Sequence, residues 1–221
     1  MTKTSRSAAA APRREGYHHG NLRAALVAAA TALLEDGGPL GVSLRGAARR
    51  AGVSQAAPYR HFRDKEALLA AVAEEGFRRV AAATARAIAP HEDDPIRALR
   101  AVASAYLRQA TDEPAHYRLM YAPTVRGREH PALRQAAESV WENFTTLIRR
   151  AQRARRLRAG EPDRLAFVLW SLLHGLAMLL VDRQLPARVT SIPVELVADY
   201  ATQTLLEGLA LPAEPRRRRR A

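Results

Sequence analysis

Cysteine is absent from the 221 residues, and aromatic residues make up only 5% of them. Without cysteine the chain has neither a disulfide framework nor a thiolate metal site, as is usual for proteins of a reducing cytosol. No segment alternates apolar and polar residues over the length of a strand, whereas alanine and leucine are abundant throughout. These features predict an all-α protein in the cytoplasm.

Leader and enzyme motifs are missing from the sequence as well. The first 16 residues are basic, but their apolar run, Ala8 to Ala11, is too short for the core of a signal peptide. There is no phosphate-binding glycine loop, no H-E-x-x-H pattern and no E-x-x-H ligand pair. The adjacent His18 and His19 would point about 100° apart on a helix, which disfavours a shared metal ion. We therefore expect no export, no metal or other cofactor and no enzymatic activity.

Positive charge is in excess, with 35 basic and 22 acidic residues and a net charge of +13. The excess is concentrated in residues 1–79 and in the last eleven residues, which contain the run Arg216 to Arg220. Such a distribution favours polyphosphate partners, because binding them releases counterions. We expect residues 1–16 to be a disordered basic arm and residues 211–221 a disordered arginine-rich tail. Whether either segment binds DNA stays open.

The stretch from Val42 to Lys65 has the pattern of a helix-turn-helix. Ser43 is a good N-cap for a first helix, and Gly52 lies where the end of that helix needs a residue that tolerates positive φ. Ser54 then predicts the cap of a second helix that runs from Gln55 to Phe62, with small alanines that let the two helices approach closely. This second helix could lie deep in a groove.

The flanking segments complete a small N-terminal unit. Apolar residues recur on one helical face from Leu22 to Leu33, and the sequence Gly37-Gly38-Pro39 stops that helix. Gly46 lies inside the first helix of the pair, where glycine costs about 1 kcal/mol relative to alanine, so we expect slight fraying there. Asp64 caps a longer helix that links this unit to the rest of the chain, and the segment from Pro90 to Pro95 marks the domain boundary.

The C-terminal part contains several predicted helices. They cover Ile96 to Ala110, a short segment from Ala115 to Tyr121, Leu133 to Leu157, Leu165 to Val181 and Ile192 to Leu209. The 17 residues 165–181 are at the lower limit for a membrane span of about 30 Å, but we interpret them as a buried interface helix. We expect helices 165–181 and 192–209 to pair with their mates in a four-helix homodimer interface, away from any membrane. The basic end of helix 133–157 is interpreted as a solvated helix end, with a nucleic-acid patch as the alternative.

Several motifs resemble a known family. The run from Tyr17 to Val80 resembles the DNA-binding domain of the TetR family of transcriptional repressors. The matching motifs are Leu44-Arg45, Ala51-Gly52-Val53-Ser54, Tyr59-Arg60-His61-Phe62 and Asp64-Lys65-Glu66-Ala67-Leu68. The sequence from Trp170 to Gly175 is similar to the W-x-x-x-H-G signature of one C-terminal domain type, here called WHG.

The resemblance covers residues 17–209 and implies both architecture and function. It implies an N-terminal three-helix helix-turn-helix domain at residues 17–80, followed at residues 95–210 by a larger helical domain for ligand binding and dimerisation. It also implies a homodimeric, sequence-specific DNA-binding regulator. We expect a repressor that a small-molecule effector releases from a palindromic DNA operator.

The resemblance further implies the residues that contact DNA. They are Ser43, Arg45, Ser54, Gln55, Ala56, Ala57, Tyr59, His61 and Lys65. The side chains of Gln55 and Arg45 have donors that suit base edges in the major groove. We expect Tyr59, His61 and Lys65 to bind phosphates, supported by the free N–H groups of the helix that follows Asp64.

Most aromatic residues of the C-terminal half fall on helices that could surround one cavity. With two histidines and a methionine, these candidate effector-binding residues are Tyr106, His116, Tyr117, Met120, Tyr121, Trp141, Phe144, Trp170 and His174. Core packing explains each residue taken alone. Taken together, they suit a small, mostly apolar effector and disfavour a strongly anionic one, because no arginine lies within the apolar faces. Residues 116–121 are the expected lever between the effector and the DNA-binding domain.

Two other functions fit part of the sequence. A helical-bundle enzyme or small-molecule carrier matches the fold class but lacks catalytic motifs. A sequence-independent DNA-compacting protein matches the charge and the arginine tail, but would show no large preference for one site on DNA.

Overall fold

The computed structural model describes residues 22–125 and 130–209. Over these residues the fold is all-helical, with the predicted helix-turn-helix segment at the N-terminus and a larger helical domain after it. The elements are α1 (Leu22–Gly41), α2 (Leu44–Ala51), η2 (Ala57–Arg60), α3 (Lys65–Ile88), η3 (Ala89–His91), α4 (Pro95–Asp112), α5 (Pro114–Met120), α6 (Pro131–Arg153), α7 (Pro162–Val181), α8 (Ala187–Thr190) and α9 (Val194–Leu209). The predicted arm and tail lie outside the described residues.

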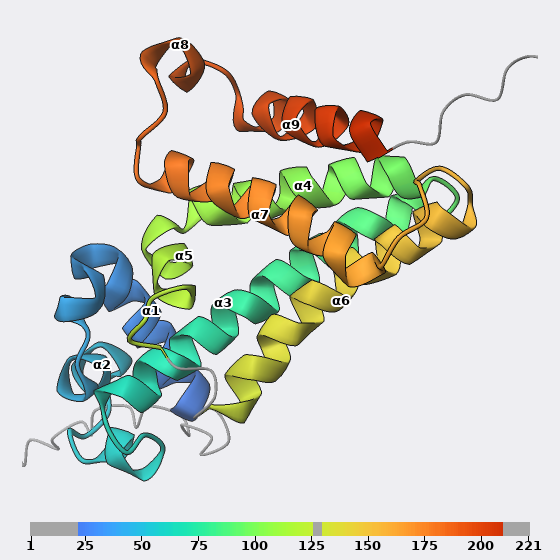
Figure 1. The fold of residues 1–221 in the computed structure, drawn as a ribbon. Coiled ribbons are helices and arrows are strands. Elements are labelled where there is room, and N and C mark those ends of the chain that lie inside the picture. The colour runs from blue at the N-terminus through green and yellow to red at the C-terminus, as the bar shows by residue number, and fades with distance from the viewer. Residues whose placement is uncertain (1–21, 126–129, 210–221) are drawn as a thin grey trace, which may run out of the picture.

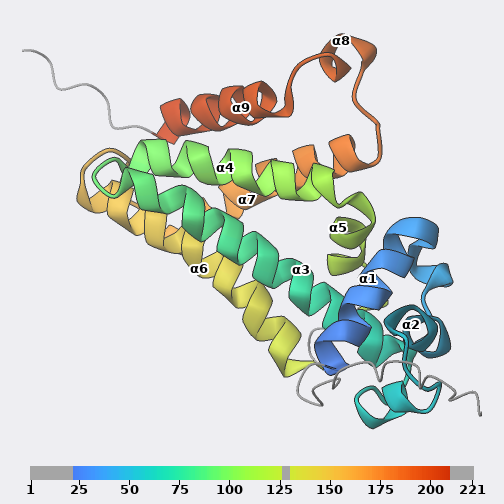
Figure 2. The same ribbon diagram turned by 180° about the vertical axis from the view of Figure 1, so that it is seen from behind.

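The arrangement separates a small head from an elongated body (Figure 1). We call α1, α2, η2 and the start of α3 the head. The long helices α3 and α6 run side by side away from it, α4 and α7 lie across their far part, and α9 packs on the outer side of α4 (Figure 2). The short α5 lies between the head and α7 (Figure 1).

Three of the predicted helix boundaries in the head are confirmed. The hydroxyl of Ser43 accepts a 3.0 Å hydrogen bond from the backbone N–H of Gly46 and caps α2. Gly52 ends α2 at φ 70°, in the left-handed region that glycine adopts readily. Asp64 caps α3 by accepting a 2.8 Å bond from the N–H of Ala67. In α1 the helical geometry stops at Gly37 and Gly38, as the sequence predicted.

Gly46 has a packing role that the sequence did not reveal. α2 continues through this residue, and Gly46 is buried. A Cβ atom at this position would lie 2.9 Å from Ser43 Oγ and 3.2 Å from Leu33 Cδ1. The glycine therefore lets α2 pack closely against α1 while its N–H serves the cap, so the expected fraying of α2 is not seen.

The second helix of the motif is shorter than predicted. The segment forms only the four-residue 3₁₀ helix η2, and the Ser54 side chain does not cap it. Pro58 explains the difference. In an α-helix from Gln55, the N–H of residue 58 would bond to the carbonyl of Ser54, and proline has no N–H. Ala57 instead donates a 3.0 Å bond to Ser54 O, and Pro58 O accepts from both His61 and Phe62.

The long helices of the body lie where they were predicted, but the short η3 and α8 were not predicted, and α6 ends early. This helix stops at Arg153, four residues before the predicted end, because Arg155 adopts φ 53°. The N–H of Arg156 then donates a 2.8 Å bond back to Ala151 O, which is the pattern of a Schellman C-cap. Leu157 returns to the core and is buried.

Candidate functional sites

The predicted DNA contacts lie on the outer side of the head. Ser43, Arg45, Ser54, Gln55, Ala56, Tyr59 and His61 are exposed, and Ala57 and Lys65 are half-buried. Their neighbours Leu44, Ala47, Ala48, Pro58 and Phe62 are buried in the core. This alternation brings the predicted residues together on α2, on the segment around η2 and at the start of α3.

The charges of the head leave four cations available on this side. Arg50 pairs with Asp36 at 2.8 Å, and Arg63 pairs with Asp64 at 2.7 Å. The bond from the Ala67 N–H, followed by the Arg63 side chain, lowers the pKa of Asp64, so this cap is ionised at neutral pH. Four other cations, here called the head cations, form no ion pair among the described residues: Arg45, Arg49, Arg60 and Lys65. Sequence reasoning did not place Arg49 and Arg60 among the contacts, although their exposure follows from the helical period.

A cavity of about 190 Å³ lies in the body between α3, α5, α6 and α7. Its lining consists of Phe77, Tyr121, Ala137, Val140, Trp141, Phe144 and Trp170. Four of these residues were predicted effector contacts. The other three, Phe77, Ala137 and Val140, carry only an apolar helical period in the sequence, which does not distinguish a cavity wall from solid core.

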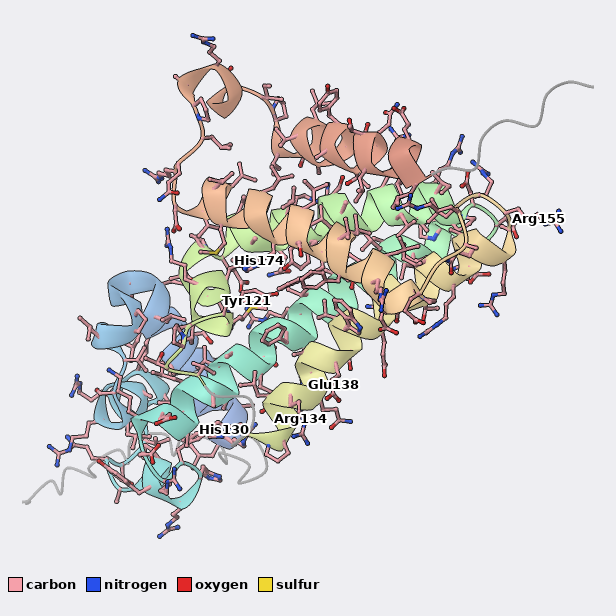
Figure 3. The ribbon with its side chains drawn as sticks, in the orientation of Figure 1. Tyr121, His130, Arg134, Glu138, Arg155 and His174 are labelled. Carbon is pink, nitrogen blue, oxygen red and sulfur yellow. The ribbon has the colours of Figure 1, made fainter. Side chains whose placement is uncertain are left out.

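Three more predicted residues form a hydrogen-bonded chain next to the cavity. The hydroxyl of Tyr121 bonds to that of Tyr106, and Tyr106 bonds to Tyr117, both at 2.9 Å. The hydroxyl of Tyr117 is hydrogen-bonded to Nδ1 of His174 at 2.8 Å. The His174 ring packs against Tyr121 with ring centroids 4.3 Å apart (Figure 3). Burial raises the pKa of all three phenols and lowers the pKa of His174, so the chain is neutral.

The last two predicted residues, His116 and Met120, lie at the contact between α5 and α3. The ring of His116 is buried, with Nε2 2.6 Å from Val72 O and Nδ1 3.1 Å from Glu113 Oε2. Both partners are hydrogen-bond acceptors. The nine residues therefore do not surround one cavity, and these two belong to the junction of body and head.

Gly76 makes this junction possible. A Cβ atom at Gly76 would lie 2.7 Å from the sulfur of Met120 and 2.8 Å from Nε2 of His116. Only a residue without a side chain lets α5 approach α3 so closely. The backbone N–H of His116 also donates a 2.9 Å bond to Glu35 of α1. The seven residues of α5 thus touch the head at one end and the cavity, through Tyr121, at the other.

A third candidate surface is the exposed apolar face of α7 and α9. Phe167, Val168 and Leu179 on α7, and Leu196 and Tyr200 on α9, are exposed. An open hollow of about 630 Å³ separates the two helices. By length and composition α7 could cross a membrane, and a third of its most apolar part is buried within the chain.

Comparisons with known proteins match the same regions. Residues 26–72 match the family model described as bacterial regulatory proteins, tetR family, and residues 99–205 match a tetracyclin repressor-like C-terminal domain. No curated protein matches the sequence.

Solved structures are similar over most of the chain. A protein with unknown function from Rhodococcus sp. RHA1 is 36% identical, with a TM-score of 0.77, and the match covers 90% of this chain and 100% of that one. The TetR family transcriptional regulator PfmR from Thermus thermophilus is 21% identical, with a TM-score of 0.64 and coverage of 84% and 99%. The fatty acid degradation regulator FadR from Bacillus halodurans is 12% identical, with a TM-score of 0.66 and coverage of 88% and 97%.

Proposed function

Because the chain belongs to the tetR family of bacterial regulatory proteins, and is thus a non-enzymatic DNA-binding transcriptional regulator, we propose that it is a homodimeric repressor. In this proposal, a small, mostly apolar effector enters the body and releases the protein from a palindromic operator in the cytoplasm. We also propose that residues 95–210 form an effector-binding and dimerisation domain of the WHG type. Residues 17–80 form the domain that reads DNA.

The observation that carries the proposal is the position of α5. Its last turn supports the cavity through Tyr121, and its first turn contacts Glu35 in the head. A ligand that moves the Tyr121 ring therefore acts on a seven-residue helix that also holds the head. By linkage, a ligand that binds better when the heads are wrongly spaced weakens DNA binding by the same factor.

The lining of the cavity favours an uncharged ligand. Its seven residues are apolar or aromatic, and the Tyr121 hydroxyl is already bonded to Tyr106. A carboxylate would lose its water there without meeting a cation, at a cost of several kcal/mol. An apolar cavity of about 150 Å³ is sufficient for benzene. The cavity of about 190 Å³ suits an uncharged aromatic ligand with one or two rings.

The exposed face of α7 and α9 supports the dimer. A short recognition segment reads too few base pairs to find one site in a genome, so two copies on a two-fold axis are needed. Helices 165–181 and 192–209 would pack against their mates and cover Phe167 and Tyr200. The operator half-sites would then be about 34–36 Å apart, or a multiple of that spacing.

The test measures ligand binding and DNA release together. A duplex that the protein selects from a random pool serves as the operator, with indole and naphthalene as neutral probes and benzoate and naphthoate as charged controls. We expect the neutral probes to raise Tm and to release the duplex. We expect the charged controls, benzoate and naphthoate, to do neither. Neutral probes that change neither Tm nor DNA affinity contradict the effector proposal. Equal affinity for the selected duplex and random DNA favours the sequence-independent alternative.

A further inference from the structure

Cations without an ion-pair partner form two groups in the described chain. Most of its arginines contact a carboxylate or a backbone carbonyl, as Arg100 does with Asp199 and Arg118 with Asp182. The first group without such a partner is the head cations. The second consists of Arg153, Arg155, Arg158 and Arg164, which we call the distal arginine cluster. Within residues 22–125 and 130–209, Arg86, Arg156, Arg183 and Arg188 are further arginines without an ion pair, and they are left outside both groups. Arg156 interacts electrostatically with Asp94.

The distal arginine cluster lies at the opposite end of the body from the head. Figure 3 shows Arg155 at one end of α6, and Arg134 at the end that faces the head. The 23 residues of α6 span about 35 Å at 1.5 Å per residue. This is several times the Debye length of about 8 Å at physiological salt. The cluster therefore adds nothing to the binding of a duplex held at the head.

The backbone that carries the cluster is held in place while its side chains stay exposed. Nε2 of Gln152 donates bonds of 3.1 Å to Arg158 O and 3.0 Å to Gly160 O. The N–H of Arg158 donates a 2.8 Å bond to Leu209 O at the end of α9. All four arginine side chains are nevertheless exposed. Little backbone ordering is therefore needed when a partner binds.

Arg155 occupies a backbone conformation that disfavours its own side chain. Its φ of 53° lies in the left-handed region, and the position just after a helix end is one where glycine is most common. A residue other than glycine adopts this region at a cost in free energy, and such residues concentrate at functional sites. The strain at Arg155 is an observation independent of the charge, and it marks the same loop.

The composition of the cluster identifies the class of partner. None of the exposed large hydrophobic residues in the described chain falls within residues 149–164. A protein interface needs an apolar centre, and stable anchoring at a membrane surface takes an apolar or lipid anchor in addition to basic charge, whereas a phosphate backbone needs only cations. The two acidic residues of the loop do not cancel the charge, because Asp163 is held by Trp141 and Arg149 and leaves only Glu161.

We propose that the distal arginine cluster is a second, sequence-independent surface for the phosphate backbone of duplex DNA. A regulator bound to its operator through the head can then bridge to another duplex segment through the cluster. This function goes beyond operator binding, because it requires two duplexes on one protein molecule.

A bridging assay with the full-length protein tests the proposal. The selected duplex is fixed to beads and loaded with protein, and capture of a second, fluorescent duplex of unrelated sequence is measured. The variant R153Q/R155Q/R164Q is compared with the matched control R86Q/R183Q/R188Q, which removes the same charge and also alters one left-handed arginine, Arg183. Arg158 is left unchanged because it lines the hollow between α7 and α9. The same variants are also made in a protein with glutamine at Arg216 to Arg220. In that protein the arginine tail cannot bind the second duplex in place of the cluster.

We expect the cluster variant to lose capture at least about tenfold. Its log–log salt slope for the second duplex should fall by about 2 to 3, at about 0.9 per phosphate contact. Affinity for the selected duplex and Tm should match the control. Equal capture by the two variants in both series overturns the proposal. The proposal is also overturned if the wild-type protein captures no second duplex. It is likewise overturned if the cluster captures anionic phosphatidylserine vesicles but no duplex.

Discussion

The backbone N–H of His116 donates a 2.9 Å hydrogen bond to Oε1 of Glu35, and this bond joins α5 of the body to α1 of the head. At its other end α5 stops beside the cavity, where Tyr121 forms part of the lining. The contact is therefore the direct mechanical link between the candidate effector site and the candidate DNA-binding face. Its strength determines how much of a movement at Tyr121 reaches the head.

Replacing Glu35 by alanine should uncouple the two sites. The side chain is exposed and remote from the predicted DNA contacts, so the separate affinities for DNA and for a neutral aromatic probe should change less than about threefold. The factor by which the probe weakens DNA binding should fall about fivefold, since a bond to a charged, partly solvated group is worth about 1 kcal/mol. Titrations of DNA with and without the probe measure this factor. Asp36→Ala is the control, because Asp36 pairs with Arg50 inside the head; equal coupling in both variants contradicts the link.

Replacing Gly76 by alanine should force α5 away from α3. The new methyl group would approach the sulfur of Met120 to 2.7 Å and Nε2 of His116 to 2.8 Å. Overpacking of this kind costs about 1–3 kcal/mol, which thermal unfolding detects as a lower Tm. In the double variant Gly76→Ala/Met120→Ala one of the two clashes is removed. The Tm difference between this double variant and Met120→Ala alone should therefore be smaller than the Tm difference between Gly76→Ala and the wild type. A Tm for Gly76→Ala equal to that of the wild type would show that α5 is not held in this position.

Local rules predicted three of the helix caps in the head correctly, but not the cap expected at Ser54. Ser43, Gly52 and Asp64 act through hydrogen bonds and φ angles within a few residues, and the structure has all three caps as expected. Two helix boundaries were predicted wrongly, and the residues responsible do not alter the spacing of apolar residues from which helices are predicted. Pro58 removes the bond that would start a helix at Gln55, and Arg155 ends α6 early at a position where glycine is usual.

The candidate effector site could be predicted only in part, because it depends on contacts between distant segments. Aromatic residues marked the right helices, and Tyr121, Trp141, Phe144 and Trp170 do meet at one cavity. Nothing local indicated that His116 would face Val72 of α3. The role of Gly76 could not be predicted either, because a glycine inside a helix does not indicate which other helix packs against it.

Two substitutions in the head should separate base contacts from phosphate contacts. Both Gln55 and Lys65 lie on the outer side of the head, and neither side chain has a partner among the described residues. Gln55→Ala should change which base is preferred at one position, at about 1–3 kcal/mol. Lys65→Ala should weaken binding to all sequences alike and lower the salt slope by about 1. Affinities for the selected duplex, its single-base variants and random DNA give the result. Equal loss on selected and random DNA for Gln55→Ala contradicts its assignment as a base contact.

His174 should make stability depend on pH below neutrality. Burial lowers the pKa of His174, so the folded protein takes up this proton at a lower pH than the unfolded chain does. The stability that neutral His174 contributes is therefore present above the unfolded pKa of about 6.5 and is lost as the pH falls. In His174→Asn an amide group takes the place of Nδ1, can still form the hydrogen bond with the Tyr117 hydroxyl and does not titrate. The difference in Tm between the wild type and this variant should shrink or reverse from pH 7 to pH 5, and a constant difference contradicts the assignment.

A charge on the exposed face of α9 should break the dimer. Tyr200 is 77% exposed in the single chain and lines the hollow between α7 and α9, so a mate would bury it. In Tyr200→Asp a carboxylate would have to lose its water on entering that largely apolar interface, at a cost of several kcal/mol. Sedimentation at micromolar concentration should show a monomer, while the helical circular dichroism stays unchanged.

The same variant should lose operator affinity, because a monomer presents a single reading head. Two linked heads bind with the second contact made intramolecularly, so losing the link reduces affinity by about a hundredfold or more. Leu40→Asp is the matched control, since Leu40 is 94% exposed in the head and lies outside the face of α7 and α9. It should remain dimeric and keep its affinity. Two results would contradict a two-fold operator complex. Either the Tyr200→Asp protein stays dimeric, or it is monomeric and binds the selected duplex as tightly as the wild type does.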